Sequence, residues 1–203
     1  MTRTKDITAE TNILNAAKRI FQKKGMDGAR MQEIADEAGI NKALLHYYYR
    51  SKQLLFEAVF KSAFMLLAPQ LNKILNNDDS LNDKIKNFTK NYISFIIKHP
   101  YLPNFIISEL NRNPEFVEKL ISEKNFPTIQ KFKNQVLENI ENGLITPIKP
   151  EHLFINIMAL NIFPFIASPL LKGFLKIDAK NYEQLMEERA TEVSNFIINA
   201  IKI

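Results

Sequence analysis

The sequence has no cysteine among its 203 residues. Without a thiol, the chain has no disulfide framework, no thiolate nucleophile and no cysteine ligand for a metal. Glycine is also scarce, with five residues in the whole chain, and no segment alternates between apolar and polar residues with the period of a strand. Hydrophobic residues make up 46% of the sequence, which is enough to bury a core. The sequence therefore predicts a globular, all-α fold.

Groups that carry out catalysis or bind metals are few and scattered. The three histidines, His46, His99 and His152, lie in separate segments. None has the His-x-x-x-His or Glu-x-x-His spacing that places two metal ligands on one face of a helix, and no glycine-rich phosphate loop is present. We therefore expect no metal site, no cofactor and no enzymatic activity.

The longest strongly apolar segment is "FINIMALNIFPFIASPLL", residues 154–171. It contains two asparagines, one serine and two prolines and has no basic flank on its N-terminal side, so a buried helix is favoured over a membrane span. The first ten residues, "MTRTKDITAE", lack the apolar run of a signal peptide. We expect a cytoplasmic protein without a membrane partner.

Positive charge is concentrated near the N-terminus. Residues 1–52 hold ten Lys/Arg against six Asp/Glu, a net charge of +4 out of +5 for the whole chain. A polyanion such as DNA would bind there. A charge of this size is also compatible with an ordinary solvated surface, so charge alone does not decide between the two interpretations.

Three helices are predicted in this basic segment. The first covers about residues 8–24 and ends at Gly25. The second is short, and its apolar residues recur at i, i+3, i+4 and i+7: Met31, Ile34, Ala35 and Ala38. Gly39 suits the C-cap, and Asn41 can cap a third helix almost at once. Two short helices joined by "AGIN" after a longer one are typical of a helix-turn-helix, whose last helix enters the DNA major groove.

The third helix, "NKALLHYYYRSK" from Asn41 to Lys52, is the candidate recognition helix. Leu45 and Tyr49 lie four residues apart and should face the core. Three residues share the outer face, where they can reach base edges: Lys42, Ala43 and His46. Tyr47 and Tyr48 should point to either side, where a phenol can bind phosphate.

The segment "MQEIADEAGINKALLHYYYRSKQLLFEAVF" resembles the DNA-binding domain of TetR/AcrR-type transcriptional repressors. The resemblance covers about residues 8–60. Residues that match the family pattern are Ile34, Ala35, Ala38, Gly39, Leu45, Tyr48, Ser51, Lys52 and Leu55, with close substitutes at Ile40, Asn41 and Tyr49. It implies that Tyr48 and Lys52 bind backbone phosphate and that Arg30 lies near the duplex. The DNA-contact set is then Arg30, Asn41, Lys42, Ala43, Leu44, His46, Tyr47, Tyr48 and Lys52.

The recognition helix departs from the family pattern at its centre. The usual Gly-Thr-Leu-Tyr is replaced by Ala43-Leu44-Leu45-His46, so the threonine hydroxyl that often reaches a base or phosphate is missing. Leu44 can either touch a thymine methyl group or cover the edge of the core. The operator sequence therefore cannot be transferred from a relative.

The chain is divided into residues 1–52, the helix-turn-helix domain, and residues 53–203. The resemblance implies that the second part is a helical domain for ligand binding and dimerisation. Its pattern predicts helices near 51–76, 81–98, 101–111, 114–123, 126–142, 150–173 and 181–201. Pro69 should bend the first of these, and Pro164 and Pro169 should distort the sixth.

Two features of the second part bear on function. The last two helices carry long apolar faces, which either pair with a second copy or belong to the core; the interface candidates are Phe154, Met158, Phe165, Val193, Phe196 and Ile197. Aromatic residues are dense in the middle of the chain and form either an apolar pocket or core; the ligand candidates are Phe88, Tyr92, Phe95, Phe105, Asn161 and Phe163.

The resemblance thus implies a TetR-type transcriptional repressor. Such a protein would bind a palindromic, double-stranded DNA operator as a homodimer and respond to a small apolar or amphipathic molecule. The alternative is a helical architectural DNA-binding protein, or an interaction module, without a small-molecule effector. Selective binding to one palindrome over random duplex would separate the two.

Overall fold

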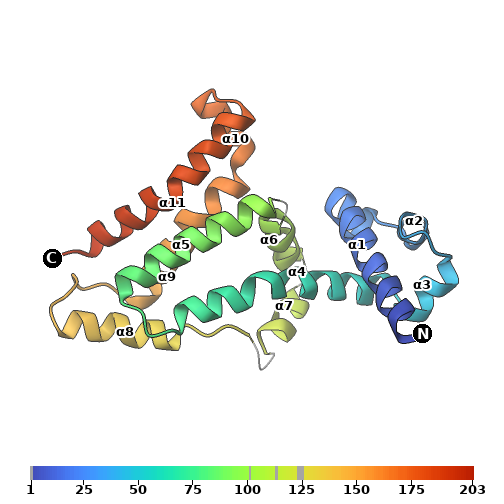
Figure 1. Cartoon of the computed structure of the whole chain (residues 1–203), viewed down its shortest axis with the longest axis horizontal. Coiled ribbons are helices and arrows are strands. Elements are labelled where there is room, and N and C mark those ends of the chain that lie inside the picture. Colours follow the sequence, from blue (N-terminus) through green and yellow to red (C-terminus); the bar gives the residue numbers. More distant parts are fainter. Residues whose placement is uncertain (1, 101, 113, 123–125) are drawn as a thin grey trace. The chain divides into compact units, whose positions relative to one another are not determined.

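The computed structural model describes residues 2–100, 102–112, 114–122 and 126–203, and every regular element in these ranges is a helix (Figure 1). The predicted all-α class is confirmed. The helices are α1 (Thr2–Gly28), α2 (Met31–Glu37), α3 (Lys42–Tyr48), α4 (Lys52–Leu75), α5 (Leu81–Lys98), α6 (Leu102–Arg112), α7 (Pro114–Ile121), α8 (Gln130–Glu141), α9 (Pro150–Ile166), α10 (Ser168–Leu175) and α11 (Ala179–Ile201).

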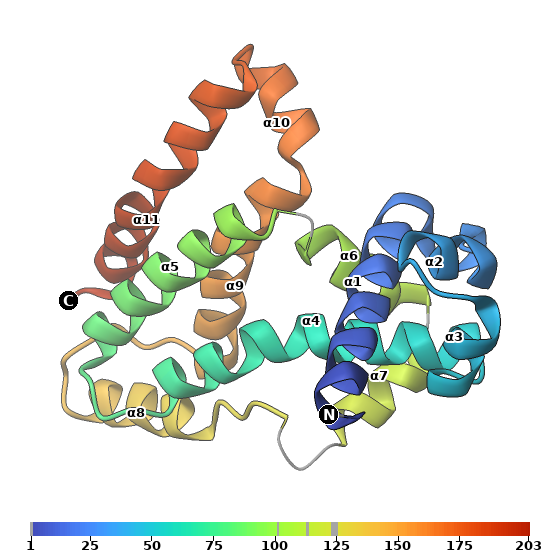
Figure 2. The same cartoon turned by 45° about the vertical axis from the view of Figure 1, so that its right-hand side comes forward.

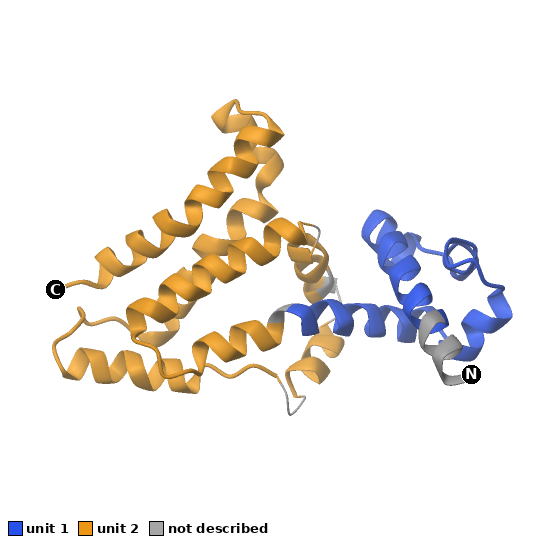
Figure 3. Cartoon of the chain, viewed as in Figure 1, with its two compact units in different colours: residues 1–66 blue, residues 67–203 orange. Residues whose placement is uncertain are grey.

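The chain forms two compact units, residues 1–66 and residues 67–203 (Figure 3). The domain boundary is expected after residue 52, whereas the first compact unit extends into α4, to residue 66. The reason is the packing of the first half of α4: Leu55, Phe56 and Phe60 are fully buried. The ring of Phe56 lies edge-on to that of Phe21 in α1, with 5.1 Å between centroids. The start of α4 therefore belongs to the core of the N-terminal unit.

In the N-terminal unit, α1 begins earlier than the sequence pattern indicates, at Thr2 instead of residue 8. The predicted stop at Gly25 appears as an interruption, because Gly25 has a positive φ of 67° between two helical stretches. The apolar face of α1 is buried at Ile13, Ala17 and Phe21. This face is the surface on which the two short helices are assembled.

In the second unit, α5 packs alongside α11 and also against α9 and α8 (Figure 2). Helix α5 has a wide buried face, which includes Ile85, Phe88 and Tyr92, because it has helices on several sides. The helix predicted over 150–173 is two helices, α9 and α10, bent by 77° at Ala167. Pro169 lies in the first turn of α10 and cannot continue the hydrogen-bond ladder of α9. The expected distortion is confirmed next to Pro169, whereas Pro164 lies inside α9, which continues to Ile166.

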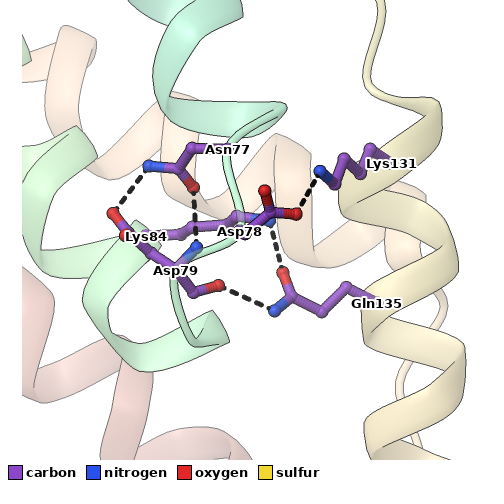
Figure 4. Close-up of polar contacts among 6 residues, drawn as sticks. All are labelled: Asn77, Asp78, Asp79, Lys84, Lys131 and Gln135. Carbon is purple, nitrogen blue, oxygen red and sulfur yellow. Dashed lines mark hydrogen bonds and ion pairs between the residues drawn. The ribbon is translucent and has the colours of Figure 1, made fainter.

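The loop between α4 and α5 is tied to α8 by a polar cluster around the buried Lys84 (Figure 4). Lys84 is 2% exposed, and its Nζ donates to Oε1 of Gln135 at 2.6 Å. The amide of Gln135 donates to the carbonyl oxygen of Asp79, and Lys131 pairs with Asp78 at 2.6 Å. Burial is the largest cause that lowers the pKa of Lys84. No sequence pattern indicates this contact, because it joins residues 51 positions apart.

Two helical elements of the described chain have the length and apolar composition of a membrane span: α4, and the bent pair α9 and α10. The first half of α4 is packed in the N-terminal unit, where Leu55 and Phe56 are fully buried. Helix α9 buries Leu153, Ile157 and Asn161. Core helices of folded domains have this same character, so neither element requires a membrane.

Candidate nucleic-acid interface

The turn before α3 is a Schellman motif centred on Gly39. The N–H of Gly39 donates to the carbonyl of Asp36 at 3.1 Å, and the N–H of Ile40 donates to that of Ala35 at 3.0 Å. Gly39 has φ +68°, a conformation that a residue with a Cβ atom rarely adopts. The motif ends α2 and reverses the chain within a few residues, as the "AGIN" turn predicts.

Helix α3 is held by one cap and one buried side chain. Asn41 caps it, since the N–H of Leu44 donates to Asn41 Oδ1 at 2.7 Å. Leu45 is the residue of α3 with a fully buried side chain. Because seven residues are too few for a stable isolated helix, these two anchors and the preceding turn define where α3 lies.

The outer side of α3 is open to solvent. Most of the predicted DNA-contact residues are exposed: Arg30, Asn41, Lys42, Ala43, Leu44, His46 and Tyr47. Tyr48 and Lys52 are half-buried. Leu44 is 37% exposed, so much of its side chain lies on the surface. The predicted contact residues on and around α3 are therefore at or near the surface, and Leu45 is the side chain of this seven-residue helix that is buried.

The three consecutive tyrosines have different surroundings. Tyr47 is 79% exposed, and its ring lies edge-on to that of Tyr48 with 5.5 Å between centroids. Tyr49 was expected to point into the core, but it is only half-buried. Helix α3 ends at Tyr48, and Tyr49 takes an extended conformation from which its hydroxyl donates to Oε1 of Glu10 at 3.2 Å. Burial and the Glu10 carboxylate raise the pKa of Tyr49 to about 12.

Lys52 makes a structural contact that no local sequence pattern indicates. Its Nζ donates to the carbonyl oxygens of Asp27 at 3.3 Å and Ala29 at 3.2 Å. Asp27 lies in the last turn of α1 and Ala29 follows that helix, so the ammonium group joins the start of α4 to the end of α1 and the connection to α2. An ammonium has three donors, and two bonds leave one for a further acceptor such as phosphate.

Two ion pairs connect α1 to α2. Nε of Arg19 lies 2.7 Å from Glu37 Oε1, and Nζ of Lys24 lies 2.9 Å from Glu33 Oε1. The hydrogen bond from Lys24 is the main cause that lowers the pKa of Glu33. These pairs use two of the cations in the basic segment to hold the helices together. The excess positive charge is therefore carried by other side chains, including Arg30 and Lys42.

The residues predicted to bind a ligand do not form one open pocket. Four aromatic residues are buried: Phe88, Tyr92, Phe95 and Phe105. The rings of Phe88 and Tyr92 stack with 5.5 Å between centroids, and burial raises the pKa of Tyr92. Phe163 is 54% exposed, so its side chain is not part of the buried core. These aromatics are core of the second unit, the alternative that the sequence left open.

Asn161, the polar ligand candidate, is fully buried. Its Nδ2 donates to the carbonyl of Ile157 at 2.7 Å, one turn earlier in α9. Its Oδ1 has no hydrogen-bond partner within the described part of the chain. The same Nδ2 also donates to Oγ1 of Thr89 in α5 at 3.4 Å, so the buried amide joins α9 to α5.

The predicted interface residues separate into two groups. Val193 and Ile197 are each 3% exposed and lie in the core of their own unit, so these two were assigned to the wrong face of α11. Phe154, Met158 and Phe165 are half-buried, and Phe196 is 64% exposed. Apolar residues spaced three and four apart cover a wide arc of a helix surface. On α11 this arc includes both core residues and surface residues, so the spacing alone does not separate them.

The comparisons with known proteins agree on one family. Residues 13–59 match the model described as "Bacterial regulatory proteins, tetR family". The HTH-type transcriptional regulator RutR of Escherichia coli K12 is 28% identical over 149 residues, covering 72% of this chain and 69% of RutR. The negative transcriptional regulator IcaR of the biofilm operon icaADBC from Staphylococcus aureus strain Newman is 31% identical over 106 residues, covering 51% of this chain and 54% of IcaR.

The fold is shared with solved structures. A putative fatty acid metabolism regulator from Clostridium perfringens superimposes with a TM-score of 0.70 at 20% identity, covering 95% of this chain and 99% of that one. The similarity therefore extends over both units, beyond the segment that matches the family model.

Gly39→Ala should destabilise the protein by about 1–2 kcal/mol, because alanine at φ +68° is strained. Gly173→Ala is the matched control. Both glycines have open space around the position of a Cβ atom, but Gly173 lies in α10 without a positive φ. There alanine should stabilise by up to about 1 kcal/mol. Denaturant unfolding measures both changes, and equal effects at the two sites would contradict this account of the turn.

Tyr49 should titrate about two pH units above an ordinary tyrosine, near the pKa of about 12. Because this pKa is raised in the folded state, the stability that Tyr49 contributes is fully present below pH 10. This contribution is lost as the pH rises toward 12, because the unfolded chain releases its proton at a lower pH than the folded chain does. Ultraviolet titration of wild type and Tyr49→Phe isolates this phenol. If the difference spectrum showed a transition near pH 10, the contact with Glu10 would not be present in solution.

Proposed function

Because the chain is a transcriptional regulator of the TetR family, we propose that it is a cytoplasmic repressor that binds a palindromic DNA operator as a homodimer. We further propose that a small molecule bound in the second unit controls this binding. The observation that carries the proposal is the open outer face of α3, held in place by Asn41, Leu45 and the turn at Gly39.

In this proposal some side chains around α3 contact base edges and others contact phosphates. Lys42 and His46 lie four residues apart, on one face of the helix, where their nitrogens reach base edges in the major groove. Tyr47 and Tyr48 present hydroxyl groups to the phosphates on either side. The remaining donor of Lys52 binds a phosphate while its other two hold the carbonyls of Asp27 and Ala29.

A palindrome is read by two copies of α3 about 34 Å apart, so the chain must dimerise. Exposed apolar side chains on the last long helices support this. Ile155 and Phe163 on α9 are 56% and 54% exposed, and Leu185 and Phe196 on α11 are also exposed. We propose that these residues form the interface, in place of the buried Val193 and Ile197.

Helix α4 is the element that carries the effector signal in this proposal. It runs without interruption from Lys52 to Leu75, so its first half belongs to the N-terminal unit and its end to the second. Pro69 lies inside it and removes one backbone donor from its ladder. A coupling of only about 1–3 kcal/mol would change operator affinity about 5–150-fold.

His46→Ala should change which base is preferred at one position of each half-site, while Lys52→Ala should weaken binding to all sequences alike and lower the salt slope by about one. Lys73→Ala is the control, because it removes the same charge from the exposed surface of α4 in the second unit. Fluorescence anisotropy on a panel of operator variants measures affinity and preference together.

Lys52→Ala also removes two hydrogen bonds to backbone carbonyls, so its unfolding must be measured beside its DNA affinity. At a temperature where the variant is fully folded, the uniform loss of affinity should persist. If His46→Ala and Lys52→Ala gave the same uniform loss, the assignment of His46 to base edges would be wrong.

Phe196→Asp should convert the dimer to a monomer and weaken binding to a full operator, because it places a charge in the proposed apolar interface. Leu137→Asp is the matched control, since Leu137 on α8 is 47% exposed and lies outside that interface. Light scattering at micromolar concentration reports the mass of both variants. A wild-type protein that remained monomeric, or a Phe196→Asp variant that remained dimeric, would contradict the proposed interface.

A further inference from the structure

A long groove follows the antiparallel pair α5 and α11, which lie side by side in Figures 1 and 2. Its largest part, called here the lysine cavity, has a volume of about 580 Å³ and is lined by α5 from Lys86 to Lys98 and by α11 from Glu187 to Asn195. A second cavity of about 390 Å³ adjoins it, because Ile97 lines both. Volumes of this size are typical of small-molecule sites.

The lysine cavity is positively charged. Its described lining contains Lys86, Lys90 and Lys98 from α5, and Glu187 is the acidic side chain that faces them. The three lysines are exposed, and Lys86 and Lys90 lie four residues apart on one helix face, where like charges repel. Hydroxyl groups of Ser94 and Thr191 line the same cavity. This arrangement of donors is complementary to an anion.

The floor of the groove is apolar. Ile93 is 1% exposed and lines the lysine cavity with Ala190, and Ile97 continues this surface into the second cavity. There Phe165 and Met186 are among the apolar lining residues, and the charged Lys172 and Glu183 line the same cavity. From Lys90 to Ile97 the helix rises about 10 Å, roughly the length of a medium alkyl chain. Lys98 beside Ile97 and Lys172 in the second cavity add two cations at the other end of the groove.

The groove is on the opposite side of α11 from the proposed dimer interface. Leu185 and Phe196 are separated by about three full helical turns and so lie on one stripe. Glu187 and Ser194, which line the cavity, lie about half a turn away from that stripe. A dimer formed through Leu185 and Phe196 therefore leaves the groove accessible.

We propose that this groove binds an anionic amphiphile with a single head group. Lys86 and Lys90 bind a carboxylate or similar head group, and the alkyl tail lies over Ile93 and Ile97 toward Phe165 and Met186. The role of this groove as the effector site rests on the proposed function. The groove adds to that function the class of molecule that binds and the residues that select it. The occupied groove joins α5 to α11 through one ligand.

Decanoate is a suitable probe, and calorimetry on the full-length protein is the measurement. Decanoate should bind one molecule per chain below its micelle concentration. Decanol and decyltrimethylammonium should bind at least about tenfold more weakly, because they lack the charge-assisted hydrogen bonds to lysine. Butyrate should also bind weakly, because it has too little apolar surface to reach Ile97.

Lys86→Gln combined with Lys90→Gln should weaken decanoate binding at least about tenfold while leaving decanol binding unchanged. The control combines Lys73→Gln with Lys149→Gln, two exposed lysines outside the described linings, and should change the affinity by less than about twofold. Ile97→Ser should weaken decanoate but not butyrate. Equal affinity for decanoate and decanol, or an unchanged affinity in the Lys86/Lys90 variant, would overturn the site.

Different results would contradict the binding site and its regulatory role. If decanoate bound as described and operator affinity stayed the same, the groove would be a binding site and the effector role would be wrong. If decanoate did not bind and another small molecule released the operator, the groove would be wrong and the proposed repressor function would stand. Light scattering on the Lys86/Lys90 variant should show an unchanged mass, and a monomer would indicate that the groove holds a second copy of the chain instead.

Discussion

The position of α3 depends on the tight turn at Gly39. The candidate DNA interface depends on the position of α3, and so on this turn. A helix of seven residues is not stable alone in water, so its place must be imposed by its neighbours. The Schellman bonds at Gly39 and Ile40 end α2, the Asn41 cap begins α3, and Leu45 fixes α3 on the core. Every other side chain of α3 is then left at or near the surface. A short, weakly anchored helix thereby presents nearly all of its side chains to a partner.

Cations in this protein have structural as well as recognition roles. Arg19 and Lys24 join α1 to α2, and Lys52 binds two backbone carbonyls, so a formal charge count overstates the surface that attracts DNA. In the second unit Lys84 is buried against Gln135, whereas the lysines of the α5–α11 groove remain at the surface. The position of each ammonium group relative to the core, and not the net charge, separates these roles.

The short helices and their turn could be predicted from the sequence because local rules determine them: a positive-φ glycine, an asparagine cap and a four-residue apolar spacing. Most helices of the second unit were also predictable from the breaks in the pattern, but α8 begins at Gln130 instead of residue 126, and the helix predicted over 150–173 is divided into α9 and α10. The apolar periodicity of α11 does not distinguish its surface side from its core side. For this reason Val193 and Ile197, which are buried, were predicted to lie at an interface. The contacts of Lys52 and Lys84 join distant parts of the chain and have no local signature. The same limit applies to the groove, which exists only once α5 and α11 pack together.

Selection of binding sites from random duplex DNA by the wild-type protein tests the central claim most directly. If α3 is the recognition helix of a homodimeric repressor, the enriched sequences will be palindromes whose half-site centres lie about one helical turn, or 10 base pairs, apart or a small multiple of that spacing. Enrichment of a single unrepeated site, or binding without any sequence preference, would contradict the account and favour an architectural DNA-binding protein.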